Sequence, residues 1–257
     1  MRFLVKLHFV LRTIFGLDPR VFLRSLTGLP KYFKDYLRFS AMCRGRLTIL
    51  PCLQDWAEEA GAVDNEYFWQ DLLVAKLVYA AKPVKHVDVG SRLDGFVAHV
   101  ASYRDIEVMD IRPLSRDIPG VRYVRADVMS LPKELVNYCD SLSCLHALEH
   151  FGLGRYGDPI DPEGHIKGIA GMSAMLSPGG NFYLSVPIGA ARVEFNANRI
   201  FDPREIIEIC EDHALQLSSV TVLHDKTLSE ITASEMANLN AYSGAQYALA
   251  VFLFQKE

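Results

Sequence analysis

A series of short apolar runs between residues 84 and 186 constrains the fold of this chain more than any other feature. The runs are Val84–Val89, Ile106–Met109, Val121–Arg125, Ser141–Leu145 and Asn181–Val186. Stretches with a helical pattern separate them, at Gly95–Tyr103, Pro132–Tyr138 and Glu163–Leu176, and another, Tyr67–Ala81, precedes them. Short buried strands that alternate with helices form a parallel sheet covered on both faces. The sequence therefore predicts a doubly wound α/β domain.

The end of the chain departs from this alternation. Leu215–Leu223 and Tyr247–Phe254 are strands joined by a polar segment without a crossover helix, which predicts an antiparallel pair at the sheet edge. The expected fold is thus α/β and Rossmann-like, with a mostly parallel seven-stranded sheet and an antiparallel terminal strand pair. At 257 residues the chain has room for one such domain, 51–257, preceded by a basic helical N-terminal arm, 1–50.

The arm differs from the rest of the chain in charge. Residues 1–46 hold ten lysines and arginines against Asp18 and Asp35, although the whole chain has a net charge of -4. Apolar residues recur at helical spacing from Phe3 to Phe15, which indicates an amphipathic helix, and Val21–Arg46 mixes basic with aromatic residues. An anionic membrane surface suits this pattern. The alternative, left open, is that the apolar face packs on the chain's own core or on a second subunit of a homo-oligomer.

Cysteine use and hydropathy bound the setting. The five cysteines form no CxxC pair, which favours a reduced, cytoplasmic environment. Lys6, His8 and Arg12 interrupt the apolar run that a signal peptide would need. We therefore expect a cytoplasmic protein, held at the inner face of the membrane if the arm binds lipid, and no nucleic acid partner.

Polar residues stand directly after the predicted strands. Ligands of a doubly wound sheet collect at the carboxyl ends of the strands, near the point where strand order reverses. The segments there are Asp88-Val-Gly90-Ser91-Arg92-Leu-Asp-Gly95, Asp110-Ile111, Ala126-Asp127-Val128 and Leu145-His146-Ala-Leu-Glu149-His150. Glycines let backbone approach a ligand closely, and Asp110 stands where a carboxylate binds ribose hydroxyls.

Together with Leu176-Ser-Pro-Gly-Gly before the fifth strand, this series resembles the class I S-adenosylmethionine-dependent methyltransferases over about residues 84–257. The resemblance implies a methyltransferase with S-adenosylmethionine as cofactor and S-adenosylhomocysteine as product. It assigns the cofactor's methionine part to Asp88, Gly90 and Ser91. The ribose falls to Asp110 with Ile111 and the adenine to Asp127 with Val128, while His146 is expected beside the cofactor.

The glycine loop departs from the family pattern. Arg92 occupies a position where a second glycine is usual, and the last glycine is displaced to Gly95. Arg92 either pairs with the cofactor's carboxylate or blocks the pocket. Residues 111–120 are also too short and too rich in proline for the usual helix between the second and third strands.

The loop after the fourth strand is where the resemblance places the methyl acceptor. A neutral hydroxyl attacks poorly, so O-methylation needs a base. His150 is the predicted base, Glu149 its orienting partner or a cofactor contact, and His165 a second candidate. A divalent cation on His146, Glu149 and His150 is a further hypothesis. Residues 146–150 also match the HxxEH pattern of zinc peptidases, but their place after an apolar strand argues against it.

A softer resemblance, around Asp88–Asp110 and His146–His165, is to small methyltransferase-like proteins associated with bacterial surface-polysaccharide assembly. It implies a glycan or small-molecule hydroxyl as acceptor. Gly152–Gly164 is a predicted substrate lid, and Arg192, Arg199 and Arg204 are candidate contacts for an anionic group. Two alternatives remain: a non-catalytic cofactor-binding or scaffold protein, favoured by Arg92, and a nicotinamide-dependent oxidoreductase, disfavoured because the loop is not GxGxxG.

Overall fold

The computed structural model of the protein describes residues 16, 18–53, 56, 63, 65–224 and 227–257. The chain divides into two units, Met1–Ala62 and Val63–Glu257, and each is described by itself. The domain boundary expected at residue 50 stays a prediction. The amphipathic helix predicted from Phe3 to Phe15 lies outside the described residues.

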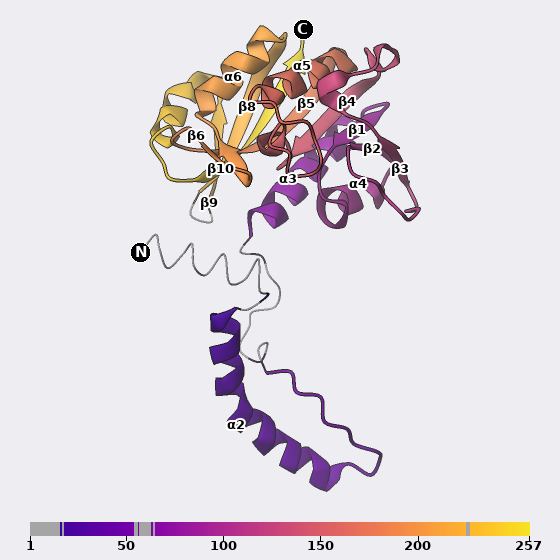
Figure 1. Cartoon of the computed structure of the whole chain (residues 1–257), viewed down its shortest axis with the longest axis vertical. Helices are drawn as coiled ribbons and strands as arrows, with labels where there is room; N and C mark the ends of the chain where they lie inside the picture. The colour runs from indigo at the N-terminus through magenta and orange to yellow at the C-terminus, as the bar shows by residue number, and fades with distance from the viewer. Residues whose placement is uncertain (1–15, 17, 54–55, 57–62, 64, 225–226) are drawn as a thin grey trace. The chain divides into compact units, whose positions relative to one another are not determined.

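The first unit contains the long helix α2, Pro19–Met42 (Figure 1). Asp18 caps its start by accepting a hydrogen bond from the backbone N–H of Arg20, and Pro19 suits a first turn because it has no N–H to leave unpaired. With about 3.6 residues per turn, the cations of α2 gather on one side. They are Arg20, Arg24, Lys31, Lys34 and Arg38. The opposite side carries exposed apolar side chains, among them Phe22, Leu26, Phe33 and Leu37.

The second unit is built on an eight-stranded sheet in the order β3-β2-β1-β4-β5-β10-β8-β9 (Figure 1). Its first five strands are parallel neighbours. They are β1 (His86–Val89), β2 (Ile106–Asp110), β3 (Val121–Arg125), β4 (Cys139–Leu145) and β5 (Leu176–Ile188). The strand order reverses between β1 and β4, so the carboxyl ends of these two strands flank the switch point where ligands bind in such sheets.

The far edge of the sheet is antiparallel. β10 (Ala248–Lys256) lies between β5 and β8 (Leu215–His224) and runs antiparallel to both. This confirms the predicted Rossmann-like fold class with its terminal strand pair. The sheet has eight strands rather than seven, because part of the expected polar connection forms β9 (Thr227–Thr232), which extends the edge beyond β8. A 3₁₀ stretch, Ala233–Tyr242, follows it.

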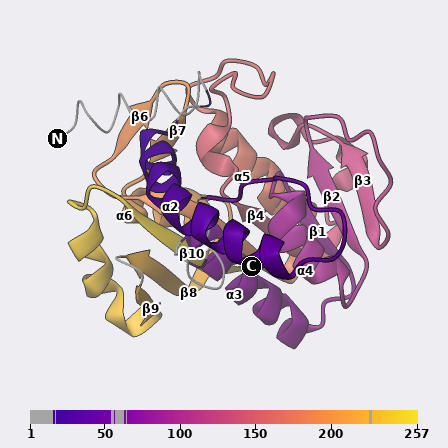
Figure 2. The same ribbon diagram turned by 90° about the horizontal axis from the view of Figure 1, so that it is seen from below.

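Helices cover both faces of the sheet (Figures 1 and 2). α3 (Glu66–Ala81) and α4 (Ala98–Ala101) supply one apolar layer, and α5 (Gly164–Met175) and α6 (Pro203–Asp212) supply the other. Asn65 caps α3 by accepting from the Phe68 N–H at 2.9 Å. The predicted helices at 67–81 and 163–176 thus correspond to α3 and α5.

Three segments differ from the local expectations. The helix expected near 132–138 is only a 3₁₀ turn, Lys133–Leu135, and the one expected at 95–103 is a π-helical turn, Leu93–Val97, followed by the single-turn α4. The Leu176-Ser-Pro-Gly-Gly segment is part of β5 and not a separate turn. A short hairpin, β6 (Arg192–Glu194) and β7 (Asn198–Ile200), forms its own two-stranded sheet.

Candidate functional site

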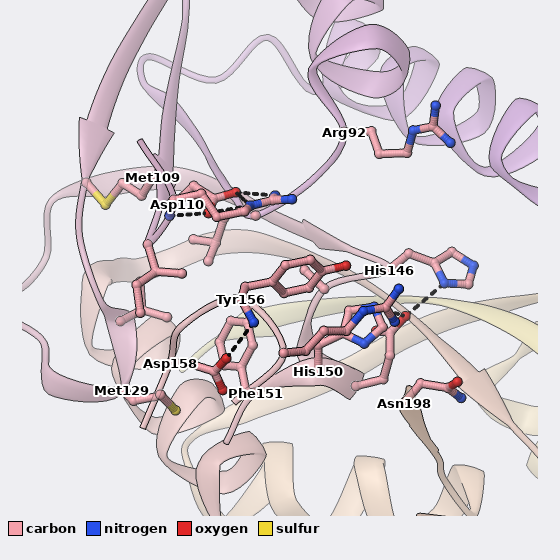
Figure 3. Close-up of a pocket in the computed structure, with 18 of the residues that line it drawn as sticks. Arg92, Met109, Asp110, Met129, His146, His150, Phe151, Tyr156, Asp158 and Asn198 are labelled. Atoms are coloured by element: carbon pink, nitrogen blue, oxygen red, sulfur yellow. Dashed lines mark hydrogen bonds and ion pairs between the residues drawn. The ribbon is translucent and has the colours of Figure 1, made fainter. Parts of the chain in front are cut away.

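A cavity of about 440 Å³ opens at the carboxyl ends of β1 to β4, at the switch point of the sheet (Figure 3). Nine of the residues singled out from the sequence line it. They are Gly90, Arg92, Asp110, Ile111, Asp127, Val128, His146, Glu149 and His150. Asp88, Ser91, Gly95 and His165 are not among its lining residues.

Asp88 and Ser91 shape the turn below the cavity. The Asp88 carboxylate is fully buried and accepts hydrogen bonds from the Ser91 N–H at 3.0 Å and from the hydroxyls of Ser91 and Ser143 at 2.6 Å each. The Ser91 hydroxyl also accepts from the Leu145 N–H at 3.1 Å, which ties the turn to β4. The two residues therefore position the turn and do not reach the cavity.

Gly90 forms the part of this turn that faces the cavity. Its φ of +73° lies in the left-handed region, and a Cβ there would stand 3.0 Å from the Cβ of Ala147. Gly95 has a different role, since a Cβ on it would stand 2.2 Å from the Asp71 carboxylate on α3. The displaced glycine is thus required by packing between the loop and α3.

Arg92 does not fill the cavity. Its guanidinium donates to the Asp94 carboxylate at 2.7 and 3.0 Å, and its side chain is 56% exposed. It also lies over the Tyr67 ring, 5.1 Å from the ring centroid. The side chain therefore stands at the rim of the pocket, as Figure 3 shows.

Asp110 ends β2 with its carboxylate occupied. Arg112 donates to it through its backbone N–H at 2.8 Å and through Nε at 2.9 and 3.1 Å, and its Nη2 pairs with the same carboxylate. The Arg112 guanidinium also lies 4.7 Å from the centre of the Tyr156 ring. The segment 111–120 forms no helix, as expected.

The far end of the cavity is mostly apolar. Met109, Ala126, Val128 and Met129 line it beside Asp127. The Asp127 carboxylate caps the 3₁₀ turn Val128–Ser130 by accepting from the Met129 N–H at 2.9 Å. An apolar slot beside a carboxylate suits a purine ring with an amino group.

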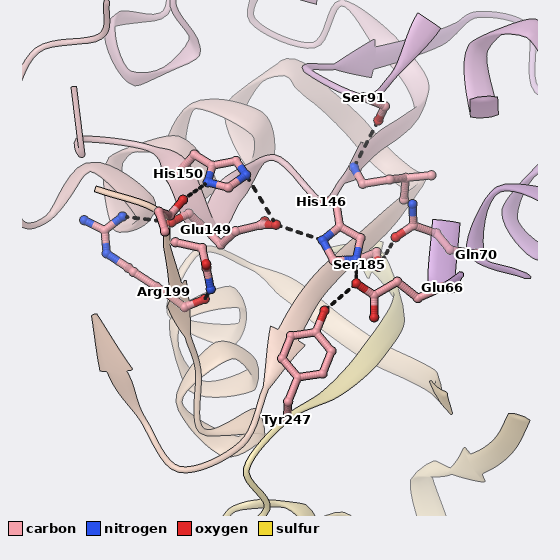
Figure 4. Close-up of polar contacts among 12 residues, drawn as sticks. Glu66, Gln70, Ser91, His146, Glu149, His150, Ser185, Arg199 and Tyr247 are labelled. Atoms are coloured by element: carbon pink, nitrogen blue, oxygen red, sulfur yellow. Dashed lines mark hydrogen bonds and ion pairs between the residues drawn. The ribbon is translucent and has the colours of Figure 1, made fainter. Parts of the chain in front are cut away.

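The other end of the cavity holds a buried chain of titratable groups (Figure 4). Glu149 is 1% exposed, and its Oε1 lies 2.9 Å from His146 Nδ1 and 3.7 Å from His150 Nε2. His150 Nδ1 lies 2.7 Å from the Ala197 carbonyl oxygen, which can only accept a hydrogen bond. The Nδ1 of His150 therefore carries the proton, and its Nε2 is left as the basic nitrogen.

The pKa values of the two histidines are shifted in opposite directions. Burial lowers the pKa of His150, and the Glu149 charge offsets this only in part. Burial also acts to lower the pKa of His146, but the hydrogen bond to Glu149 and the charges of Glu149 and Glu66 raise it above its ordinary value. At neutral pH this favours an uncharged His150 beside a charged His146.

Sequence reasoning missed two residues of this network, Glu66 and Tyr247. The Tyr247 hydroxyl donates to Glu66 Oε1 at 2.6 Å, and that oxygen lies 3.5 Å from His146 Nε2. Burial and the Glu66 charge raise the pKa of Tyr247. One residue starts α3 and the other precedes β10, so only the folded chain brings them together.

The structure does not bring His165 or the three candidate arginines to the cavity. His165 packs against Phe201, with ring centroids 5.5 Å apart, and burial together with the Arg199 charge lowers its pKa to about 4. Arg192 pairs with Glu194, Arg204 pairs with Asp202, and Arg199 is buried against backbone carbonyls. None of these four residues is therefore placed to contact a ligand in the cavity, although the sequence had led us to expect such contacts.

The predicted lid, Gly152–Gly164, is tied at its base. The Asp161 N–H donates to the Gly152 carbonyl at 2.9 Å, and a Cβ on Gly152 would stand 1.9 Å from the Asp161 carbonyl oxygen. Between these ties, Arg155, Tyr156 and Asp158 line the cavity (Figure 3). The segment is thus held at its base and also at its tip, where Arg155 donates to the Ala197 carbonyl at 2.7 Å.

The described part of the chain has neither a metal-binding cluster nor a membrane-spanning helix. No group of three His, Cys, Asp or Glu side chains there is placed to hold a metal ion, so the divalent-cation hypothesis gains no support. No helix within the described ranges is long and apolar enough to cross a bilayer.

The resemblance in sequence implies S-adenosylmethionine as the cofactor, and the residues that line the cavity are compatible with it. Its volume falls in the range of about 300–1,000 Å³ that is usual for small-ligand sites. Bare backbone at Gly90, the carboxylate of Asp110 and the slot beside Asp127 follow one another along the cavity. The Arg112 pair must loosen if ribose hydroxyls are to share the Asp110 carboxylate.

Comparisons with known proteins agree with this fold. Residues 117–249 match the profile of the family described as "Caenorhabditis protein of unknown function, DUF268". A search of curated proteins found no match.

Three solved structures show the similarity in fold. The 1,6-didemethyltoxoflavin-N1-methyltransferase of Burkholderia thailandensis, with 1,6-didemethyltoxoflavin and S-adenosylhomocysteine bound, has a TM-score of 0.53 and 16% identity over 74% of this chain and 79% of its own. The N-methyltransferase NodS of Bradyrhizobium japonicum WM9, in complex with S-adenosylhomocysteine, has a TM-score of 0.51 and 13% identity over 76% and 89%. The [4+2]-cyclase SpnF has a TM-score of 0.52 and 16% identity over 72% and 81%. At this identity the matches show the class I methyltransferase fold alone.

Proposed function

We propose that this chain, which belongs to the family described as "Caenorhabditis protein of unknown function, DUF268", is an S-adenosylmethionine-dependent methyltransferase that acts on a hydroxyl group of a sugar or other small acceptor. The observation that carries the proposal is a single cavity that joins Gly90, Asp110 and Asp127 to the half-buried pair His146 and His150. Two of the similar structures hold S-adenosylhomocysteine, which supports the same cofactor here.

The cofactor would supply an electrophilic methyl group on its sulfonium sulfur. The backbone at Gly90 would hold its methionine part, Asp110 its ribose, and Asp127 with Val128 its adenine. Arg92 at the rim and the Tyr156 ring over the cavity would limit the access of water.

His150 would act as the base. Its Nδ1–H is held by the Ala197 carbonyl, so the unprotonated Nε2 is free to take the proton of an acceptor hydroxyl. Nε2 and Glu149 Oε1 are two hydrogen-bond acceptors 3.7 Å apart, and two acceptors side by side favour a ligand that donates, such as a hydroxyl group. The charged His146 would neutralise Glu149 and keep this carboxylate in place.

Titration calorimetry with S-adenosylmethionine, S-adenosylhomocysteine and NAD⁺ tests the cofactor. We expect binding of both methionine-derived ligands and none of NAD⁺. The proposal fails if neither methionine-derived ligand binds, and binding of NAD⁺ alone would favour an oxidoreductase.

The His150→Gln variant tests the base. It should keep the wild-type affinity for S-adenosylhomocysteine and lose methyl transfer to neutral sugars and polyols, measured as release of S-adenosylhomocysteine. His213→Gln, at the end of α6 and outside the cavity, is the matched control. Unchanged turnover in His150→Gln would remove the assignment.

A non-catalytic role, as a cofactor-binding or scaffold protein, is the second candidate, and the pairing of the Asp110 carboxylate with Arg112 favours its scaffold form. SpnF, a [4+2]-cyclase, is similar in fold, so the fold is compatible with other chemistry. The two candidates separate on one measurement. The second candidate is favoured if the protein binds the cofactor but transfers no methyl group to the sugars and polyols tested.

For the arm we propose contact with an anionic membrane, which would be compatible with the softer resemblance to polysaccharide-assembly proteins. The support is α2, where five cations share one side and exposed Phe22, Leu26 and Phe33 lie on another. Flotation with phosphatidylglycerol vesicles should carry the full chain and leave a chain that begins at Leu50 behind. Equal behaviour of the two chains would contradict the proposal.

A further inference from the structure

The hairpin strand β7 lies against the 3₁₀ turn that carries Glu149 and His150, about fifty residues earlier in the chain. Arg199 is the central residue of β7, and only 5% of it is exposed. Its Nη1 donates to the Phe151 carbonyl at 2.5 Å and reaches the Glu149 carbonyl at 3.5 Å. Its Nη2 donates to the Pro162 carbonyl at 3.2 Å. Arg199 thus binds the main chain on both sides of His150 (Figure 4).

The residue two positions before Arg199 binds the imidazole ring itself. The Ala197 carbonyl accepts from His150 Nδ1 at 2.7 Å and from Arg155 Nη1 at 2.7 Å. The main chain on either side of His150 is therefore held by Arg199 and the imidazole ring by the Ala197 carbonyl, both from one short segment.

Burying a guanidinium is costly, because the charge loses its hydration. Burial lowers the pKa of Arg199, and the carboxylates of Asp158 and Asp161 offset this only in part. An apolar side chain could fill the same volume without this cost. The planar fork of an arginine differs from any apolar residue in holding several carbonyls in a fixed relative position.

We propose that Arg199 is a positioning residue for His150: together with the Ala197 carbonyl it forms a clamp that holds the imidazole as the Nδ1–H tautomer with Nε2 toward Glu149. The inference rests on the proposed function only in that His150 is the base. The clamp itself is a statement about the free protein and can be tested without an acceptor. Lysine cannot replace arginine here, because a point donor cannot hold carbonyls on both sides of the turn.

The test is nitrogen-15 NMR of histidine-labelled full-length protein, with the His150 signals assigned by their loss in His150→Gln. In the wild type we expect the signal of a single Nδ1–H tautomer. In Arg199→Lys we expect a mixture of both tautomers and an upward shift of the His150 titration, with unchanged affinity for S-adenosylhomocysteine.

Arg192→Lys is the matched control, because Arg192 lies on the paired strand β6 and also donates to main-chain carbonyls, those of Ala190 and Gln246. A general weakening of the hairpin would change His150 alike in both variants and would overturn the inference. So would an unchanged His150 spectrum in Arg199→Lys.

If Arg199→Lys does not fold, the NMR spectrum of the wild type still tests the proposal, because an Nε2–H tautomer of His150 would contradict the clamp. Failure of the proposed function looks different: it would leave the tautomer intact and show no cofactor binding or no methyl transfer.

Discussion

Asp88 is a carboxylate with three hydrogen-bond donors and no contact with water. Burial raises its pKa to about 6, although the bonds from Ser143 and Ser91 act to lower it. The ordinary pKa of an aspartate, which applies to the unfolded chain, is 3.8. The folded protein therefore binds a proton on the Asp88 carboxylate more tightly than the unfolded chain does. The stability contributed by Asp88 is full below about pH 4 and is lost as the pH rises through about 6.

Asp88→Asn should remove this dependence. Between pH 4 and 7 the unfolding free energy of the wild type should fall relative to that of the variant by up to about 3 kcal/mol. Urea unfolding of both proteins at several pH values measures the difference. A difference that stays constant across this range would show that Asp88 keeps an ordinary pKa.

Substitution of Gly90 and of Gly179 distinguishes the effect of backbone strain from a role in the pocket. Both have a left-handed φ, +73° and +78°, but a Cβ would meet Ala147 at 3.0 Å on Gly90 and nothing within 4 Å on Gly179. Alanine at either site should cost about 1–2 kcal/mol of stability through strain. Only Gly90→Ala should weaken the binding of S-adenosylhomocysteine in calorimetry. Equal affinities in the two variants would place the cofactor elsewhere.

The site residues that could be predicted from the sequence are those that stand at or directly after the end of a strand. Asp110, Asp127 and His150 follow strands whose apolar pattern is local, so their meeting at one edge could be predicted. Glu66 on α3, Tyr247 just before β10 and Arg199 on β7 reach the segment around His146 and His150 through contacts between distant parts of the chain. No spacing in the sequence encodes those contacts.

Among the elements, α5 shows a close approach that only glycine permits. A Cβ on Gly171 would stand 1.9 Å from the Val128 carbonyl oxygen, at the slot proposed for adenine. Helix propensity alone would make Gly171→Ala stabilising by about 1 kcal/mol. The steric clash should outweigh this gain, because the backbone must shift, and the variant should lose about 1–3 kcal/mol of stability. We also expect it to bind S-adenosylhomocysteine more weakly. Urea unfolding decides, and a stabilised variant would contradict the packing.

The difference between local patterns and contacts with distant segments also explains which helices and strands could be predicted from the sequence. α3 and α5 bury a face along their whole length, so their periodicity is visible in the sequence. β9 is an edge strand that pairs only with β8, and its polar sequence resembles that of a connection. The turn Leu93–Val97 is irregular because Gly95 leaves helical geometry where the loop meets Asp71. Both outcomes depend on neighbours that the local sequence does not contain.

At the scale of the whole molecule, charge and site belong to different units. The cations of α2 lie before residue 62, whereas every residue that lines the cavity lies between Glu66 and Tyr247. The second unit also has an apolar layer on each face of its sheet. The binding of the cofactor and the binding of a membrane should therefore be separable by cutting the chain.

A chain that begins at Val63 should bind S-adenosylhomocysteine with the affinity of the full chain, because no lining residue is lost and the core of the second unit is intact. Its thermal unfolding should remain cooperative and should shift upward when the ligand is added, since a ligand that binds only the folded state stabilises it. Calorimetry and a melting curve on both chains test this. A shorter chain that melts cooperatively but binds the ligand more weakly would mean that the first unit supplies part of the site.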